Sequence, residues 1–171
     1  MKKREEEEEA LKEPVKIHVN PKPPPEQFLT FAYGDQRFKK LKKNLGGKTD
    51  ELRIKALIEI NEDFHQADKI YAALDEKILG ELFMWSRYFE DEIRELASRA
   101  ILKVALTEKG RELIIYHKAV CDIMNLFDDH QVQVRNNAYV SLINLADFRF
   151  GVDSIIDEGI LPVLIDKLVL E

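Results

Sequence analysis

Cysteine is nearly absent from this chain of 171 residues, which has Cys121 and no other. One thiol excludes an internal disulfide framework and any zinc site built from several cysteines. Val120, Ile123 and Met124 surround Cys121 with apolar side chains on one face of a predicted helix. We therefore predict a buried and unreactive thiol.

Long apolar runs are missing too. No run approaches the ~18 residues that a membrane span needs. The N-terminus carries charged residues where a signal peptide needs an apolar stretch. With 26 basic and 32 acidic side chains the net charge is -6, which gives no electrostatic reason to bind nucleic acid. The sequence thus predicts an intracellular protein that binds neither membrane nor nucleic acid.

Motifs for catalysis and metal binding are lacking. The sequence has no glycine-rich phosphate loop and no nucleophile elbow. No two histidines are four residues apart, and none stands near cysteines or carboxylates in a metal-binding spacing; the histidines are His18, His65, His117 and His130. We predict no catalytic, metal-binding or cofactor-binding residue, and no enzyme activity.

Proline is scarce outside one stretch, because five of the six prolines lie in residues 14–25. A run of acidic residues, 5–9, precedes them, and we interpret residues 1–27 as a charged, proline-rich arm. The arm is either a disordered tail or an extended segment along a neighbouring subunit. In the second case Val15, Ile17 and Val19 contact the partner, with 21–25 as a stiff spacer. A proline-rich ligand of a small recognition domain is a weaker reading, because the motif is incomplete.

The rest of the chain repeats itself with a period of 41 residues. Leu52, Ile93 and Val134 each precede an arginine, and an alanine follows each of them after four residues. An apolar residue then follows that alanine after four more. Periods of about 40 residues in a helical pattern are typical of armadillo and HEAT arrays. We predict that residues 28–171 form an all-α, armadillo/HEAT-like α-solenoid of about three and a half repeats.

Each period is predicted to hold three helices, the third being the longest. The predicted helices are 68–76, 78–88 and 91–107 in the second repeat, 109–118, 120–128 and 131–147 in the third, and 151–158 and 160–170 in the fourth. The inward residues of the third helices are predicted to be Ile93, Leu96, Ala97, Ala100, Ile101, Val104 and Ala105, then Val134, Ala138, Leu142, Leu145 and Ala146. Gly110, Gly151 and Gly159 are expected as left-handed caps. Arg53, Arg94 and Arg135 are expected to pair with acidic groups of the preceding turn.

The two ends of the array differ from its middle. In the first repeat Lys55, Glu59 and Asp63 replace the apolar residues found one period later, which is typical of a capping repeat. Phe28, Phe31 and Tyr33 are candidates to cover its apolar flank at Ile54, Leu57 and Ile58. The fourth repeat stops after two helices, so we interpret four apolar residues as a candidate partner-binding surface: Leu161, Leu164, Ile165 and Leu168. Either the sequence is a fragment, or another protein completes the stack.

The strings Gly159-Ile-Leu-Pro-Val-Leu164 and Leu142-Ile-Asn-Leu-Ala146 resemble armadillo repeats. Peptide-binding members of that family carry a ladder of Trp and Asn on the third helix. The matching positions here hold Ile58 and Glu62, Arg99 and Lys103, and Val140 and Asn144. Trp never occurs at these positions, which argues against binding of cargo peptides in the way nuclear import adaptors bind them. Arg99 and Lys103, four residues apart on one face, are candidates to bind an acidic peptide.

The order and spacing of several short motifs point to a more specific family. Ala32-Tyr33-Gly34, Leu41 with Leu45, Arg53-x-Lys55-Ala56-Leu57 and Lys109-Gly110-Arg111 together resemble the armadillo-repeat radial spoke proteins of motile cilia, the rhabdoid-tumour deletion-region family. The resemblance implies a non-enzymatic scaffold subunit of the axonemal radial spoke. It also implies a place in the cilium and cytoplasm and, as partners, other radial spoke proteins in a large hetero-complex. The alternative is a soluble armadillo adaptor that binds an extended peptide in its groove.

Overall fold

The structure, a computed structural model, describes residues 32–34 and 36–170. Every regular element in these residues is a helix, and the helices are α2 (Gln36–Leu45), α3 (Asp50–Asp63), α4 (Ala67–Asp75), α5 (Ile78–Trp85), α6 (Asp91–Ala105), α7 (Glu108–Tyr116), α8 (Val120–Met124), α9 (Val132–Ala146), α10 (Arg149–Asp157) and α11 (Ile160–Leu170). The all-α prediction is confirmed. The predicted arm, residues 1–27, lies outside the described residues.

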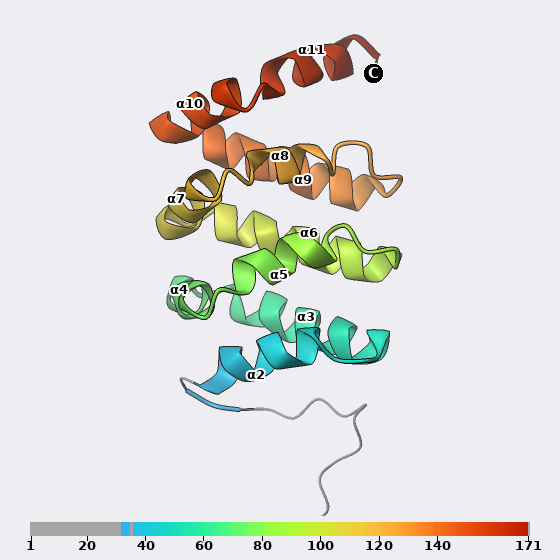
Figure 1. Cartoon of the computed structure of the whole chain (residues 1–171), viewed down its shortest axis with the longest axis vertical. Coiled ribbons are helices and arrows are strands. Elements are labelled where there is room, and N and C mark those ends of the chain that lie inside the picture. Colours follow the sequence, from blue (N-terminus) through green and yellow to red (C-terminus); the bar gives the residue numbers. More distant parts are fainter. Residues whose placement is uncertain (1–31, 35, 171) are drawn as a thin grey trace, which may run out of the picture.

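The helices stack in ladders along the long axis of the molecule, from α2 and α3 at one end to α10 and α11 at the other (Figure 1). One ladder consists of the third helices, in which α6 packs against both α3 and α9. A second consists of the first helices, in which α7 packs against both α4 and α10. The second helix α5 contacts α2 and lies on α6. Repeats stacked on their neighbours in this way make a solenoid with one continuous core.

Helix α6 shows why the third helix dominates the core. Ile93, Ala97, Ile101 and Val104 are spaced three to four residues apart and are all fully buried or nearly so. Every predicted inward residue of α6 is buried, which confirms the predicted stripe. On α9 the prediction is confirmed at four of its five positions and is wrong for Ala146, which is exposed because no described helix packs over it.

The left-handed junctions lie between the first and second helices of each repeat. Gly159 occupies one with φ 71°, as predicted. One and two periods earlier the same junction holds lysines, Lys118 with φ 52° and Lys77 with φ 58°. The prediction of left-handed caps at Gly110 and Gly151 is wrong, because both lie inside helices α7 and α10.

Replacing Lys118 by glycine is expected to stabilise the fold. A non-glycine residue in the left-handed region costs about 1–2 kcal/mol, and glycine avoids that cost while losing more chain entropy on folding. We expect Lys118→Gly to raise the free energy of unfolding by about 0.5 kcal/mol. Urea denaturation measures the change, with Lys118→Ala as the control that should bring no gain. A lower urea midpoint for Lys118→Gly than for the wild type contradicts this explanation.

Gly110 and Gly151 are needed for a close approach instead. A Cβ atom on either glycine would lie 2.0 Å from a backbone carbonyl oxygen of the preceding third helix, that of Val104 or Leu145. Real Cβ atoms do not approach backbone atoms so closely. Glycine at these two positions therefore lets each first helix begin directly against the end of the third helix before it.

The polar flank of the first repeat is closed by ion pairs. Asp63 is only 3% exposed, and its carboxylate binds the Arg37 guanidinium and the Lys69 ammonium, the latter at 2.8 Å. Arg37 also reaches Glu59 at 3.1 Å. The flank is thus polar, as predicted, but α2 and α4 cover it at Asp63.

The predicted aromatic cover of the first repeat is not supplied by Tyr33, which is 85% exposed. Phe28 and Phe31 lie outside the described residues. Leu57 is nevertheless fully buried and Ile54 packs against the core, so this flank of α3 is mostly covered by the helices themselves.

Candidate protein-interaction surfaces

Arg99 and Lys103 lie one turn apart on α6, and both already have partners within the protein. The Arg99 guanidinium donates to the Glu95 carboxylate at 2.9 Å. The Lys103 ammonium donates to the backbone carbonyl of Asn61 on α3 at 2.7 Å. Burial, followed by the nearby charge of Arg99, lowers the pKa of Lys103. The structure thus brings the two residues together. Because both already bind groups of the protein, they attract an acidic ligand less strongly than two unpaired cations would.

The remaining ladder positions of the third-helix face are mixed in character. Ile58 on α3 and Val140 on α9 are each 41% exposed, and Glu62, one turn after Ile58, is exposed as well. Asn144, the position at which peptide-binding armadillo proteins also carry Asn, donates its amide to the carbonyl of Val140 in its own helix at 2.9 Å. This face therefore offers isolated apolar and polar groups.

The three periodic arginines have structural roles. Arg53 pairs with Asp50 at 2.5 Å and Arg94 with Asp91 at 2.7 Å, which confirms the predicted pairing to the preceding turn. Arg135 differs from the prediction, because its guanidinium donates to the backbone carbonyls of the α8–α9 loop, that of Asp129 at 2.6 Å. The arginines therefore hold the loops between second and third helices.

Apolar side chains are uncovered at the end of the stack formed by α9, α10 and α11. Leu161 is 45% exposed and Ile165 is 60% exposed, while Leu164 packs partly against the core. Leu161 and Leu164 line a groove of about 390 Å³ together with Leu142, Ala146 and Ile155. We call these residues and Ile165 the terminal face. The structure describes the backbone of Leu168 on the same helix.

The inner repeats show what normally covers such residues. Val120 and Leu79, one and two periods before Leu161, are 0% and 6% exposed. Ile123 and Leu82, the equivalents of Leu164, are both fully buried. In those repeats the third helix packs on the second, α6 on α5 and α9 on α8. Within the described part of the chain no helix takes that place on α11.

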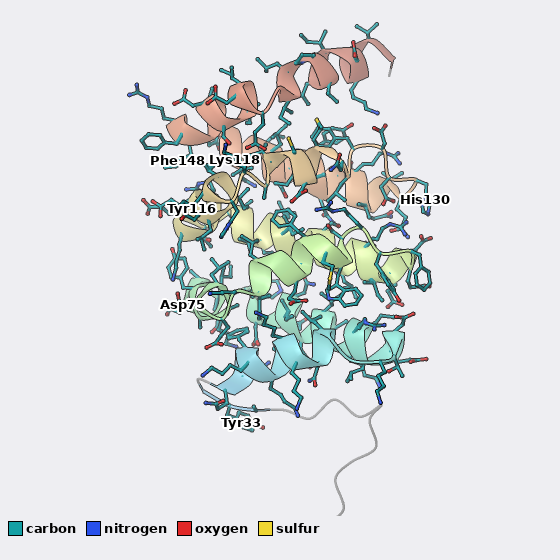
Figure 2. The ribbon with its side chains drawn as sticks, viewed as in Figure 1. Tyr33, Asp75, Tyr116, Lys118, His130 and Phe148 are labelled. Atoms are coloured by element: carbon teal, nitrogen blue, oxygen red, sulfur yellow. The ribbon has the colours of Figure 1, made fainter. Side chains whose placement is uncertain are left out.

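Sequence reasoning missed a second depression, about 940 Å³ in volume, between the second and third repeats. Its apolar lining includes Leu79, Phe83 and Met84 on α5 and Leu113 on α7. We call this depression the outer groove. It lies on the side of the first and second helices, away from the third-helix face. Figure 2 shows Asp75, at its rim, with Tyr116 on the first-helix edge of the stack, and His130 on the opposite edge.

Cys121 is half-buried, which differs from the predicted buried thiol. Its sulfur lies 3.7 Å from the carbonyl oxygen of Glu158. Burial, followed by the contact with Glu158, raises the pKa of the thiol. A raised thiol pKa leaves less of the nucleophilic thiolate, in line with the predicted low reactivity.

Among the described residues, no group of three or more His, Cys, Asp or Glu side chains is placed to hold a metal ion. None of the described helices has the length and apolar character that crossing a bilayer requires.

Comparison with known proteins places the fold. No protein-family model matches this chain. A computationally designed armadillo repeat protein for modular peptide recognition superposes with a TM-score of 0.67 at 21% identity, over 71% of this chain and 52% of that one. A designed armadillo repeat protein in complex with the peptide (KR)4 gives 0.68 at 19% identity, over 78% and 61%. The chain therefore spans about half the length of the designed proteins it resembles, and its fold is an armadillo-type α-solenoid.

Proposed function

We propose that this chain is a non-enzymatic scaffold that holds other proteins, and that the assembly it serves is the radial spoke of the ciliary axoneme. The observation that carries the scaffold role is the terminal face. Leu161 exposes 45% of its surface where its equivalents in two inner repeats expose 0% and 6%. Burying a leucine contributes about 1.5–3 kcal/mol, so this face favours association with an apolar partner surface. The choice of the radial spoke rests on the motif resemblance.

The internal repeats indicate the kind of partner that fits the terminal face. Each described third helix after the first places an apolar residue, an alanine and two more apolar residues on its buried side, as Ile93, Ala97, Ile101 and Val104 do in α6. The alanine lets the helix approach closely. We propose that a partner presents a helix of this third-helix pattern, which would lie on α11 and α9 as α6 lies on α5 and α3.

The test compares two leucines of similar exposure. Leu161 belongs to the terminal face, and Leu106, which is 58% exposed, follows α6 at a distance from that face. We expect Leu161→Glu to weaken retention on an immobilised radial spoke fraction by about tenfold or more, because one buried leucine contact is lost. Leu106→Glu should retain the wild-type affinity, and both variants should melt within a few degrees of the wild type.

The proposal fails if the purified wild type has no affinity for spoke components. It fails equally if Leu161→Glu and Leu106→Glu bind the spoke fraction alike. Ile165→Glu provides a second variant on the terminal face, because Ile165 is 60% exposed and its loss costs the fold little.

A second candidate function is that of a soluble adaptor that binds an extended peptide along the third-helix face. The observation in its favour is the likeness to designed armadillo proteins, one of which was solved with the peptide (KR)4. Here Arg99 and Lys103 would receive an acidic peptide. Arg99→Glu separates the two functions: loss of an acidic peptide ligand supports the adaptor, whereas unchanged peptide binding, together with a spoke contact that Leu161→Glu weakens, supports the scaffold.

A further inference from the structure

Neither the backbone conformation nor the packing requires glycine at position 80. It lies inside α5, and its φ is not in the left-handed region. A Cβ added to it would meet no atom within 4 Å. Glycine in a helix interior costs about 1 kcal/mol relative to alanine, so the position is unfavourable for the fold alone. Its effect is to leave the space above it open, and that space is the outer groove.

The neighbouring repeats close the corresponding space. One period before Gly80, Lys39 lies 3.8 Å from the carboxylate of Glu76. One period after it, the backbone N–H of Cys121 donates to the carboxylate of Glu158 at 2.9 Å. The equivalent of Glu76 and Glu158 at the open interface is His117, which is exposed. The outer groove therefore marks the place where the regular contact between a second helix and the next first helix is replaced by Gly80 and His117.

The charges around the outer groove favour an anionic ligand. Two ion pairs cross between its walls, Lys109 with Asp75 at 2.6 Å and Arg87 with Asp122 at 2.7 Å. These pairs engage both carboxylates of the lining. Lys77, exposed at the start of α5, has no ion-pair partner among the described residues, so its ammonium is left to meet a ligand together with the His117 imidazole.

The apolar part of the outer groove favours a large side chain. Met84 is 51% exposed, and Phe83 and Leu79 form the floor beside Gly80. A volume of about 940 Å³ is at the upper end of the range of ligand sites, roughly 300–1,000 Å³. The site is therefore large enough for several residues of a peptide.

We propose that the outer groove binds a segment of a partner protein in which large apolar side chains are flanked by acidic residues. An apolar side chain lies over Gly80 against Phe83 and Met84. An adjacent carboxylate binds the Lys77 ammonium and the His117 imidazole. This site is separate from both the terminal face and the third-helix face, so it gives the scaffold a second point of attachment.

The test uses the full chain and a fluorescein-labelled peptide, Asp-Glu-Leu-Phe-Glu-Asp, in fluorescence anisotropy. We expect a Kd below about 100 µM. Lys77→Glu should weaken binding about tenfold or more, because a charge-assisted contact becomes a repulsive one. Lys118→Glu is the matched control and should bind like the wild type, since Lys118 has the same left-handed backbone one period away and does not line the groove.

Gly80 gives a second, independent pair of variants. Gly80→Trp should abolish binding by filling the groove, and Gly80→Ala should keep it because the added methyl group meets no atom. If Gly80→Trp does not fold, the comparison of Lys77→Glu with Lys118→Glu decides alone. Leu161→Glu and Arg99→Glu should bind the peptide like the wild type, which separates failure of this site from failure of the proposed function.

Three results overturn the proposal. The first is absence of binding at 1 mM protein. The second is equal binding of the neutral peptide Asn-Gln-Leu-Phe-Gln-Asn, which would mean that the groove selects apolar side chains only. The third is concentration-dependent self-association of the chain that Gly80→Trp abolishes, because a second copy of this chain would then be the occupant.

Discussion

Gly110→Ala is expected to lower the free energy of unfolding by about 3 kcal/mol, at the upper end of what overpacking costs. The new methyl group would stand 2.0 Å from the carbonyl oxygen of Val104 and 2.7 Å from the Thr107 hydroxyl. Neither atom can move freely, because the carbonyl belongs to α6 and the hydroxyl caps α7 by accepting from the N–H of Gly110. Relief requires α7 to shift away from α6.

Gly80→Ala is the control for this prediction, because Gly80 is also a helical glycine but has open space around its Cβ position. It should stabilise the protein by about 0.5–1 kcal/mol through helix propensity. Urea denaturation followed by circular dichroism measures both variants. If Gly110→Ala is as stable as the wild type, the close approach of α7 to α6 is not a constraint on this fold.

Arg94→Ala is expected to cost about 3 kcal/mol, the lower end of the range for breaking a buried ion pair. The side chains of Arg94 and Asp129 are each 9% exposed, and the Arg94 Nε donates to Asp129 at 2.7 Å. The same guanidinium donates to the backbone carbonyls of Tyr88 at 3.0 Å and Phe89 at 2.9 Å. Alanine would leave a buried carboxylate and these two carbonyls without this donor.

Arg99→Ala is the matched control, an arginine of the same helix that forms an i,i+4 pair with Glu95 and is 48% exposed in its side chain. Such pairs contribute roughly 0.3–0.5 kcal/mol, so this variant should unfold close to the wild type. Equal losses for Arg94→Ala and Arg99→Ala in urea denaturation would contradict the role assigned to Arg94.

The acid side of the stability curve provides a check on the same contact. Burial raises the pKa of Asp129, but the hydrogen bonds from Arg94 and from the N–H of Gln131 outweigh it and hold the pKa below its ordinary value. A depressed carboxyl pKa contributes stability above the unfolded pKa of about 3.9, and the contribution is lost as the pH falls through the folded pKa. We expect Asp129→Asn to lose less stability than the wild type below about pH 4.

The repeat period was sufficient to predict the helical ladders. A spacing of 41 residues aligns Ile93 with Val134 and Ala97 with Ala138, and all four are buried. The pattern is readable because burial on one side of a helix imposes its period on the sequence. The same alignment made Leu161 the counterpart of Val120, and the structure shows that Val120 is fully buried whereas Leu161 is 45% exposed.

The roles of the glycines could not be predicted from the sequence, because the same residue type is required for different physical reasons at different positions. Glycine relieves a positive φ at Gly159, allows a close approach at Gly110, and does neither at Gly80. Two of the left-handed positions are occupied by lysine, Lys77 and Lys118, so these positions cannot be recognised from the residue type. The outer groove had one visible sign, a glycine at position 80 where the adjacent periods have Lys39 and Cys121.

The measurement that tests the scaffold role most directly is size-exclusion chromatography of a ciliary extract, with mass spectrometry to locate this protein. The scaffold account predicts that the protein elutes with a large axonemal complex containing radial spoke proteins. Elution as a free monomer of the cytosolic fraction would contradict the account and favour the soluble adaptor.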